Sequence, residues 1–574
     1  MKQIFAPREM TPQRYRWRRA APTFLWWAMV AALAVIVLYP FLMLVFTSLK
    51  TENGLGLANY IEILSDSGTL KSLVNTLLVV IPTTLLSTLI GVFLAWAVTR
   101  TDLPGRHIWK SLLAIPYLIP PFVGAIAWTF LLGPVGFFNQ LWQSLTGSAD
   151  ALVNIYSIGG MIFVMTMYRF AVPYVVVLPA MKKINSSVEE AARVSGASPW
   201  RTLRDVTLPL LTPSIVGAML MVFLFCLADF GVPAVLGAPN QIRLMSTQIY
   251  YLVGRTDLSN SLYLAAAYSI LMCLIGVVGL IAYNKVVGNN KYVVVGGKSA
   301  AHQVTRLRGG RVPLLILVAL IFGVSTLSPI AATAVTSFTK VYGLPFGGEN
   351  LTLQNFGRLL SIRNIRRAFG NSAFLAAASA VIIMVVGLSV AYVAIRGARR
   401  RLSGIRLTQL MVTVPYSIPG VVIALGMILA FKQPIFGIKL YGTIWILLIA
   451  YVARFLNLGY NNISGAISQI DPSLEEASRV SGASHLTTFR RIMLPILRPS
   501  LYSSFFLVLA PTLSELSLSS LLWSAGSETI GTVVFSSQEE GKILITAALA
   551  MVLIIAVLLL NVLVRRISGD EMGV

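Results

Sequence analysis

Four ionisable side chains stand inside long apolar stretches of this sequence and offer its most evident chemistry. They are two arginines, Arg169 and Arg454, and two acids, Asp229 and Glu515. The arginines are 285 residues apart (454 − 169 = 285) and the acids 286 (515 − 229 = 286), so they form two matching sets. A charge at the centre of a bilayer costs about 2.5–3.5 kcal/mol on insertion scales, so such residues pair or face a water-filled path.

Two interpretations of these four residues are open. In one, Asp229 and Glu515 line a translocation path and favour a cationic substrate. In the other, which we prefer, they pair with Arg169 and Arg454 as structural bridges or gate latches. Both hold if the latch breaks when the path opens.

A polar phrase of ten residues occurs twice. Residues 189–198 read EEAARVSGAS and residues 475–484 read EEASRVSGAS, so the copies differ only at Ala192 and Ser478. Each copy continues to a Leu-Pro pair and a second proline at the same offset of 286 residues (476 − 190 = 286). A polar element duplicated inside an apolar protein indicates two equivalent docking sites for a two-fold partner.

The elements that position these residues are membrane helices. The chain has 574 residues, 56% hydrophobic and 11% charged, whereas soluble domains carry roughly 25% charged residues. Its apolar runs reach the length of about 20 residues that a spanning helix needs, and they do not alternate as β-barrel strands do. We expect an all-α polytopic protein of about twelve spans, near residues 24–46, 73–98, 111–132, 158–180, 214–237, 263–283, 313–336, 373–396, 409–431, 443–465, 501–523 and 543–564.

The formal net charge of +24 follows membrane topology and does not indicate a nucleic-acid partner. Basic residues gather in alternate loops, as the positive-inside rule requires, and they both precede the first span and follow the last. An even number of spans then predicts that both termini are cytoplasmic. Cys226 and Cys273 fall within predicted spans, where buried thiols are expected and no disulfide is implied.

The chain divides into two equivalent halves. Residues 1–284 form the first six-span half with a hairpin at 185–213, residues 285–311 a cytoplasmic linker, and residues 312–574 the second half with a hairpin at 471–499. Further matched features support the duplication, including Asn75 with Asn371 and Pro116-Tyr117 with Pro415-Tyr416. Because each half crosses an even number of times, the repeats are parallel, related by an axis along the membrane normal.

Each duplicated phrase predicts a helix–turn–helix hairpin on the basic, cytoplasmic side. Asp471, placed before a proline, can cap the first helix of its hairpin. Gly196 and Gly482 fit the left-handed position that ends a helix. Glu190 and Glu476 are expected to remain accessible to solvent.

The pattern Glu-Ala-Ala, three residues, Gly, nine residues, then Ile/Val-x-Leu-Pro resembles the EAA motif of importer-type ABC transporter permeases. The first copy is Glu190-Ala191-Ala192 with Gly196, and the second is Glu476-Ala477-Ser478 with Gly482, where Ser478 departs from the third position. The resemblance covers essentially the whole chain and implies the type I importer permease fold. It also implies that each motif is a coupling helix seated in a cleft of an ATP-hydrolysing subunit, where Glu190 and Glu476 pair with basic residues.

The same resemblance implies the partners. One permease chain would carry two copies of an ABC ATPase subunit in the bacterial cytoplasmic (inner) membrane. A periplasmic or lipid-anchored binding protein would deliver substrate. The chain would be no enzyme, with no catalytic residue, cofactor or metal site.

The fused arrangement and the stretch 228–233 (ADFGVP) are similar to ferric-iron permeases, so ferric iron is the expected cargo. Thiamine, 2-aminoethylphosphonate and polyamine permeases are the alternatives. The rival class is an ion-coupled secondary transporter that uses the intramembrane acids as ion sites. The duplicated cytoplasmic hairpin argues against that class, because such a carrier needs no ATPase dock.

Overall fold

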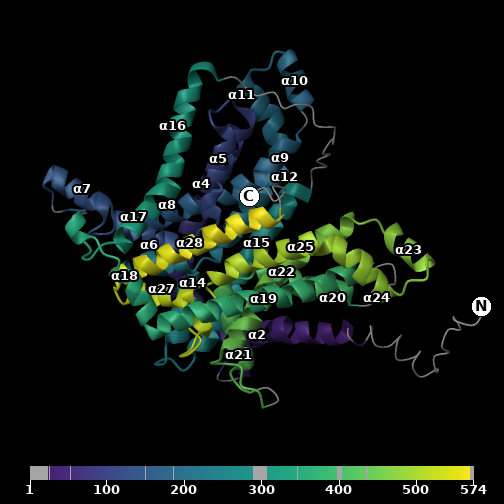
Figure 1. The fold of residues 1–574 in the computed structure, drawn as a ribbon. Helices are drawn as coiled ribbons and strands as arrows, with labels where there is room; N and C mark the ends of the chain where they lie inside the picture. Colours follow the sequence, from purple (N-terminus) through teal and green to yellow (C-terminus); the bar gives the residue numbers. More distant parts are fainter. Residues whose placement is uncertain are drawn as a thin grey trace, which may run out of the picture.

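The fold is all-α, as its composition predicts. The computed structural model describes residue 24 and residues 26–51, 54–148, 150–184, 186–288, 307–344, 347–396, 404–434 and 437–568. Within these ranges eleven helices are long and apolar enough to cross a bilayer. A twelfth crossing exists if α20 and α21, bent by 119° at their junction, count as one span. Each of the twelve expected spans therefore overlaps a helix of the structure (Figure 1).

In the first half the helices and strands are α2 (Tyr39–Leu49), β1 (Lys50–Thr51), β2 (Gly54–Leu55), α3 (Ala58–Ser65), α4 (Ser67–Arg100), α5 (Arg106–Leu112), α6 (Pro121–Leu132), α7 (Phe137–Thr146), α8 (Ile158–Arg169), α9 (Ala171–Lys183), α10 (Ser186–Val194), α11 (Pro199–Thr202), α12 (Leu208–Leu227), α13 (Gly231–Gly237), α14 (Met245–Gly254) and α15 (Ser261–Gly288). Strands β1 and β2 form a small antiparallel pair. In the second half they are α16 (Arg311–Phe322), α17 (Ser328–Ser337), α18 (Gln354–Ser361), α19 (Arg363–Arg396), α20 (Ile405–Ser417), α21 (Gly420–Phe431), α22 (Ile444–Gln469), α23 (Ser473–Val480), α24 (His485–Thr488), α25 (Leu494–Leu513), α26 (Ser519–Leu522), α27 (Ile530–Glu539) and α28 (Ile543–Ser568).

Several helices of the first half recur in the second half with their length unchanged. Helices α3 and α4 recur as α18 and α19, with both ends of each shifted by 296 residues (363 − 67 = 296). Helix α12 recurs as α25 with a shift of 286 (494 − 208 = 286), and α14 recurs as α27 with a shift of 285 (530 − 245 = 285). Within each of these helices the shift is constant, so a residue of one half identifies its counterpart in the other.

The two halves interlock through their first helices. Trp26, Val30 and Leu33, which precede α2, lie in one hydrophobic cluster with α19, α20 and α22 of the second half. Val318 of α16 lies in a cluster with α4, α9 and α12 of the first half. Figure 1 shows the same exchange, with α2 against α21, the helical stretch before α2 along α20, and α16 beside α4. Separation of the halves would therefore expose both of these surfaces.

The central helices of each half pack closely because glycines lie at their crossings. A Cβ on Gly91 of α4 would lie 2.5 Å from the carbonyl oxygen of Phe170, and one on Gly459 of α22 would lie 2.6 Å from Cγ2 of Ile383. Small residues permit such close backbone approach, and van der Waals packing drives helix association in membranes.

The fifth span of each half begins and ends earlier in the sequence than expected. It runs over Trp200–Leu227 and His485–Leu513, starting 14 and 16 residues before the expected 214 and 501 (214 − 200 = 14; 501 − 485 = 16). The second helix of each hairpin continues through a short π-helical segment into the span, because prolines near the start of α12 and α25 interrupt neither helix. The span therefore ends before Asp229 and Glu515, and the placement of these acids within the fifth helix was wrong.

The end of the predicted linker is fixed to the first half. Asp102, two residues after α4, accepts hydrogen bonds from the Leu307 N–H (2.9 Å) and from Nε of Arg311 (2.6 Å). The hydrogen bond from the Leu307 N–H lowers the pKa of Asp102, and Arg311 lowers it further by a smaller amount. These contacts place the start of α16 beside the end of α4. The greater part of the linker, residues 289–306, lies outside the described residues, as do the segments 1–23 and 569–574 at the two ends of the chain.

Candidate functional site: a central cavity and two hairpins

A cavity of about 400 Å³ lies between the two halves and receives matching residues from each. The first half contributes Tyr117, Arg169 and Asp229, and the second contributes their counterparts Tyr416, Arg454 and Glu515. The other lining side chains are mostly apolar and come from α12, α25 and α28 among other segments. The structure thus brings all four intramembrane charges to one central space.

In the first half, Arg169 and Asp229 are paired. Nη2 of Arg169 lies 2.5 Å from Oδ2 of Asp229, and the side chains are 17% and 5% exposed. Oδ1 of Asp229 accepts a hydrogen bond from the Val232 N–H at 3.1 Å. The carboxylate therefore binds both the arginine and the start of α13, after the break that ends α12.

In the second half, Arg454 and Glu515 repeat this arrangement at longer range. Nη1 of Arg454 lies 3.3 Å from Oε1 of Glu515, with the side chains 17% and 4% exposed. The Glu515 carboxylate also accepts the N–H groups of Leu518 (2.8 Å) and Ser519 (3.0 Å) at the start of α26. A Cβ on Gly420 would lie 1.8 Å from Nη1 of Arg454, so the absence of a side chain there makes room for the guanidinium.

The geometry bears on both interpretations of the four charges. Each acid contacts its arginine, as the latch interpretation expects, and each pair also lines the central cavity, as the path interpretation expects. Because each positive charge is matched by a negative one, the cavity wall has little net charge from these four groups. Their part in transport stays a prediction.

Aromatic side chains join the halves beside the cavity. The ring of Phe230, next to Asp229, lies 5.5 Å from that of Phe535 of α27, and the ring of Tyr250 of α14 lies 6.4 Å from Phe535. Phe230 is fully buried. These contacts join Phe230, at the start of α13, and α14 of the first half to α27 of the second.

The first hairpin consists of α10 and α11, joined by a turn at Gly196 with φ of +87°. The first acid of the repeated phrase, Glu189, is buried, and its Oε1 lies 3.4 Å from Nε of Arg100, the last residue of α4. Thr207 also donates to this carboxylate at 2.8 Å. The hairpin is thereby anchored to the end of the longest helix of its half.

The second hairpin, formed by α23 and α24, has the same anchor. Glu475 is 8% exposed. Its carboxylate accepts hydrogen bonds from Nε of Arg396 (2.7 Å), the last residue of α19, and from the Tyr392 hydroxyl (2.9 Å). Gly482 turns the chain with φ of +84°, and Asp471 accepts the Ser473 N–H at 2.8 Å. The left-handed glycines are confirmed; Pro472 and not Asp471 occupies the N-cap position of α23, although Asp471 binds the first N–H of that helix.

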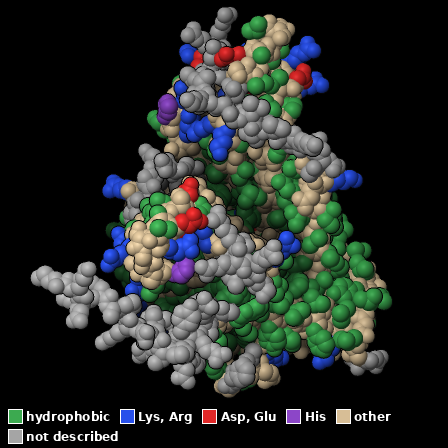
Figure 2. Space-filling model, turned by 90° about the vertical axis from the view of Figure 1, so that its right-hand side faces the viewer, with side chains coloured by type: hydrophobic (Ala, Val, Ile, Leu, Met, Phe, Trp, Pro, Cys, Tyr) green, Lys and Arg blue, Asp and Glu red, His purple; other side chains and the backbone are tan. Residues whose placement is uncertain are grey.

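Residues of the EAA-like motif face outward from these anchors. Val194 and Val480, at the tips of the hairpins, are 89% and 90% exposed, and Glu476 is exposed whereas Glu190 is half-buried. Ala191 and Ala477 are exposed, and Ala192 and Ser478 are half-buried. Figure 2 shows the side that carries the hairpins: charged side chains gather on two separate projections, with a hollow lined by hydrophobic side chains between them.

The anchoring acids were missed from the sequence. Glu189 and Glu475 belong to the repeated phrase, but their partners Arg100 and Arg396 lie 89 and 79 residues upstream (189 − 100 = 89; 475 − 396 = 79). A signal existed, because Arg100 and Arg396 are 296 residues apart (396 − 100 = 296), the shift that relates α4 to α19. Matching all charged residues at the shifts of the repeat would have found them.

The fold and these sites define a class: a polytopic membrane protein of two parallel six-span halves, with matched hairpins on one side and matched ion pairs in the centre. Residues 87–288 and 391–569, more than half of the chain, match the family described as "Binding-protein-dependent transport system inner membrane component". The chain belongs to this family, once in each half. The expected type I importer permease fold is thereby confirmed.

Curated relatives align along most of the chain. The "Ferric transport system permease protein FbpB" of Actinobacillus pleuropneumoniae is 26% identical over 85% of this chain and 69% of its own length. The "Probable ABC transporter permease protein y4fN" of Sinorhizobium fredii is 26% identical over 94% of this chain and 96% of its own. The "Putative 2-aminoethylphosphonate transport system permease protein PhnV" of Salmonella typhimurium is 31% identical over 27% of this chain and 58% of its own.

Among solved structures, a chain of a bacterial alginate ABC transporter in complex with an alginate pentasaccharide-bound periplasmic protein aligns with a TM-score of 0.41 and 19% identity. The alignment covers 49% of this chain and 99% of that chain.

Proposed function

We propose that this chain forms the complete translocation path of an ABC importer and couples it to a separate, two-fold ATPase through its two hairpins. The observation that carries the proposal is the matched geometry of the hairpins. Each is anchored to its half by a buried Glu–Arg pair, at Glu189 and Glu475, and each exposes an apolar tip residue. A surface hairpin needs no such duplicated anchor to be stable, whereas a force-transmitting element does.

In this proposal Glu190 and Glu476 bind basic residues of the ATPase, and Ala191, Ala192, Ala477 and Ser478 leave room for the ATPase surface. The turns at Gly196 and Gly482 keep each hairpin short. When ATP binding closes the ATPase dimer, the hairpins approach each other. Because each one continues into the fifth span and holds the end of α4 or α19, the movement reaches the central cavity directly.

At the cavity, the two Arg–acid pairs act as latches. Asp229 and Glu515 each bind the start of the segment that follows the fifth span, so movement of α12 or α25 pulls on the pair. Breaking the Arg169 and Arg454 contacts would open the aromatic closure beside them. The carboxylates would then be free to face a passing cation.

Ferric iron is the cargo we propose, because relatives that align along most of the chain carry that name. 2-Aminoethylphosphonate is the second candidate, favoured by the relative that is 31% identical over 27% of this chain. Thiamine and polyamine remain alternatives from the sequence resemblance alone. Metal analysis and ligand binding of the cognate binding protein decide among them.

The proposed complex contains one permease chain, two ATPase subunits and a periplasmic or lipid-anchored binding protein, with both permease termini in the cytoplasm. Co-purification tests the coupling. We expect an ATPase subunit to purify with the wild-type chain and to be lost from the double variant Glu190→Ala, Glu476→Ala. Full transport in liposomes that contain no ATPase would instead support an ion-coupled secondary transporter.

A further inference from the structure

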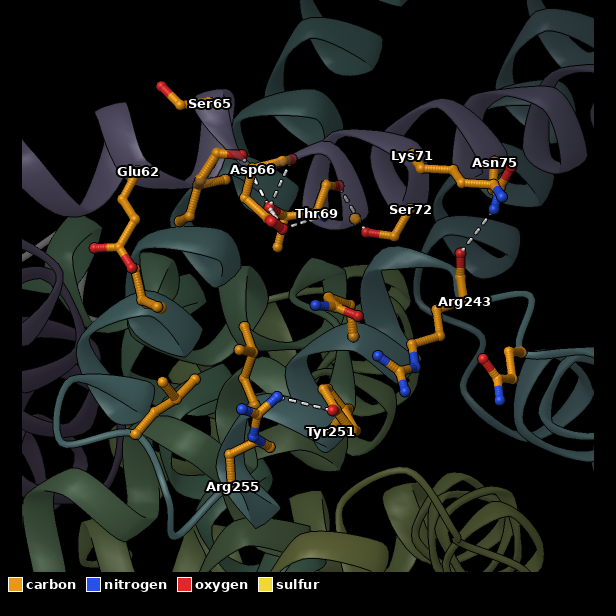
Figure 3. Close-up of a pocket in the computed structure, with 17 residues that line it drawn as sticks. Glu62, Ser65, Asp66, Thr69, Lys71, Ser72, Asn75, Arg243, Tyr251 and Arg255 are labelled. Atoms are coloured by element: carbon orange, nitrogen blue, oxygen red, sulfur yellow. Dashed lines mark hydrogen bonds between the residues drawn. The ribbon is translucent and has the colours of Figure 1, made fainter.

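A second cavity, of about 620 Å³, lies in the first half at the start of α4. It is lined by α3, the first turns of α4, the segment before α14, and α14 with the turn that follows it (Figure 3). Arg100 at the other end of α4 contacts the first hairpin. A helix of this length, 34 residues, is about 50 Å long, so the cavity opens on the opposite side of the membrane from the hairpins.

Cationic groups dominate one end of this cavity. Lys71 is exposed and Arg243 half-buried, and both line the cavity. In the close-up Lys71 lies near Asn75, whose side-chain amide donates to the Arg243 carbonyl at 3.2 Å, whereas the Arg243 guanidinium points toward Tyr251 (Figure 3). The Arg243 guanidinium stacks on the Tyr251 ring, 3.4 Å from its centroid. Arg255 donates to the Tyr251 hydroxyl at 2.8 Å. The hydrogen bond from Arg255, with a further contribution from Arg243, lowers the pKa of Tyr251.

The second half has an ion pair at the equivalent place. Arg367 is the counterpart of Lys71 (367 − 71 = 296), and Glu528 is the counterpart of Arg243 (528 − 243 = 285). There the two residues form a bidentate pair, with Nε and Nη2 of Arg367 at 2.9 and 2.8 Å from the Glu528 carboxylate. The first half has a cation at both positions, so the same closure is impossible.

Neighbouring hydrogen bonds establish that this alignment is correct. The Met245 N–H donates to Thr76 at 2.8 Å, and its counterpart Ile530 donates to Ser372 at 2.8 Å. The loop before α14 and the loop before α27 are therefore held to α4 and α19 in the same way. The two halves differ in charge at this point and not in backbone arrangement.

Arg255 is paired with Asp257, but the acids that line the cavity do not neutralise Lys71 or Arg243. Asp66 caps α4, accepting the Thr69 N–H at 2.7 Å and its hydroxyl at 2.6 Å, and these bonds lower its pKa, so it stays a carboxylate. Glu62 accepts the side-chain amide of Asn260 at 3.1 Å. Within the described part of the chain, neither Lys71 nor Arg243 forms an ion pair with an acid.

We infer that this cavity receives a carboxylate side chain of the substrate-binding protein and so fixes which lobe of that protein docks on the first half. The inference rests on the proposed importer function, in which the binding protein arrives on the side away from the hairpins. The two uncompensated cations supply the complementary charge, and the closed Arg367–Glu528 pair offers none at the equivalent place in the second half. Such complementarity sets association rate and orientation more than final affinity.

The test uses the permease–ATPase complex in lipid nanodiscs and the purified, ligand-loaded binding protein. Arg243→Glu places at this position the acid that Glu528 supplies in the other half. Lys71 should then pair with it, so the fold is retained and the cavity is closed. We expect the association rate constant at low salt to fall at least about tenfold and its salt dependence to weaken. Arg243→Gln changes the charge by half as much, so its association rate constant should lie between those of the wild type and Arg243→Glu.

Lys432→Glu is the matched control. Lys432 is exposed at the end of α21, in the loop before α22, on the same side of the membrane but outside the cavity. Lys432→Glu changes the net charge by the same amount as Arg243→Glu. We expect it to change the association rate constant by less than about twofold. Basal ATP hydrolysis without binding protein reports assembly of each complex.

Unchanged association of the Arg243→Glu complex, or an equal loss in Lys432→Glu, would overturn the inference and leave the importer proposal intact. Failure of the wild-type chain to assemble with any ATPase would refute the importer proposal itself. Loss of assembly in Arg243→Glu alone would show that Arg243 is needed for the fold, which contradicts the inferred pairing with Lys71.

Discussion

Replacing Glu475 by alanine tests the anchor of the second hairpin. The substitution removes the acceptor of two hydrogen bonds, from Arg396 at 2.7 Å and from Tyr392 at 2.9 Å. Removing one partner of a buried ion pair costs about 3–5 kcal/mol, because the other charge is left uncompensated. The Arg396 side chain is 16% exposed and keeps the Ile470 carbonyl at 2.7 Å, so the lower end of that range applies.

We therefore expect Glu475→Ala to lower the free energy of unfolding of the permease by about 3 kcal/mol. This corresponds to roughly a hundredfold change in the unfolding equilibrium. The measurement is reversible unfolding in mixed detergent micelles, followed by tryptophan fluorescence. Hydrogen exchange of α23 and of the end of α19 should localise the loss.

Glu476→Ala is the matched control, one residue further along the same helix. Glu476 is exposed, and surface substitutions usually change stability by less than about 0.5 kcal/mol. In the double variant Glu475→Ala, Arg396→Met the loss should be smaller than the sum of the single losses, because no unpaired charge remains. If Glu475→Ala were as stable as the wild type, or if the two alanine variants lost equal stability, the anchor would not exist as described.

Two further predictions concern the central cavity. In a proteoliposome uptake assay, charge reversal at Asp229 or Arg169 alone should abolish transport. The double variant Asp229→Arg, Arg169→Asp should restore part of it. Unaltered transport in the Asp229→Ala and Arg169→Ala variants would refute both the latch and the path interpretations. Gly420→Ala should destabilise the protein by about 2 kcal/mol or more, because its Cβ would lie 1.8 Å from Nη1 of Arg454. Gly465→Ala, in α22 with open space around it, should be neutral or stabilising in the same unfolding assay, and equal losses for both glycines would show that the space at Arg454 is not the cause.

Much of the fold could be predicted because it follows from composition and repetition. Apolar runs of spanning length predicted the membrane helices, of which the described part of the chain contains eleven, or twelve if α20 and α21 form one span. The repeat predicted two parallel halves. The left-handed turns at Gly196 and Gly482 follow from local residue types. These features depend on residues close together in the sequence.

The features that escaped prediction depend on contacts between distant segments. The exchange of first helices between the halves and the Glu475–Arg396 anchor both join segments about 80 or more residues apart. The early start of the fifth span was missed for another reason. The expected starts at residues 214 and 501 lie after the second proline of each copy, whereas the helix runs through these prolines and contains a π-helical segment just before the first of them. Asp229 and Glu515 consequently lie in the break after the helix, where their carboxylates bind free N–H groups.

The central claim is that one permease chain docks two ATPase subunits through its two hairpins. Native mass spectrometry of the complex purified from a membrane tests it most directly. We predict one permease to two ATPase subunits in the wild type, and one to one or less when Glu190→Ala or Glu476→Ala weakens a single dock. A wild-type complex with a single ATPase subunit, or a permease that transports without any, would contradict the account.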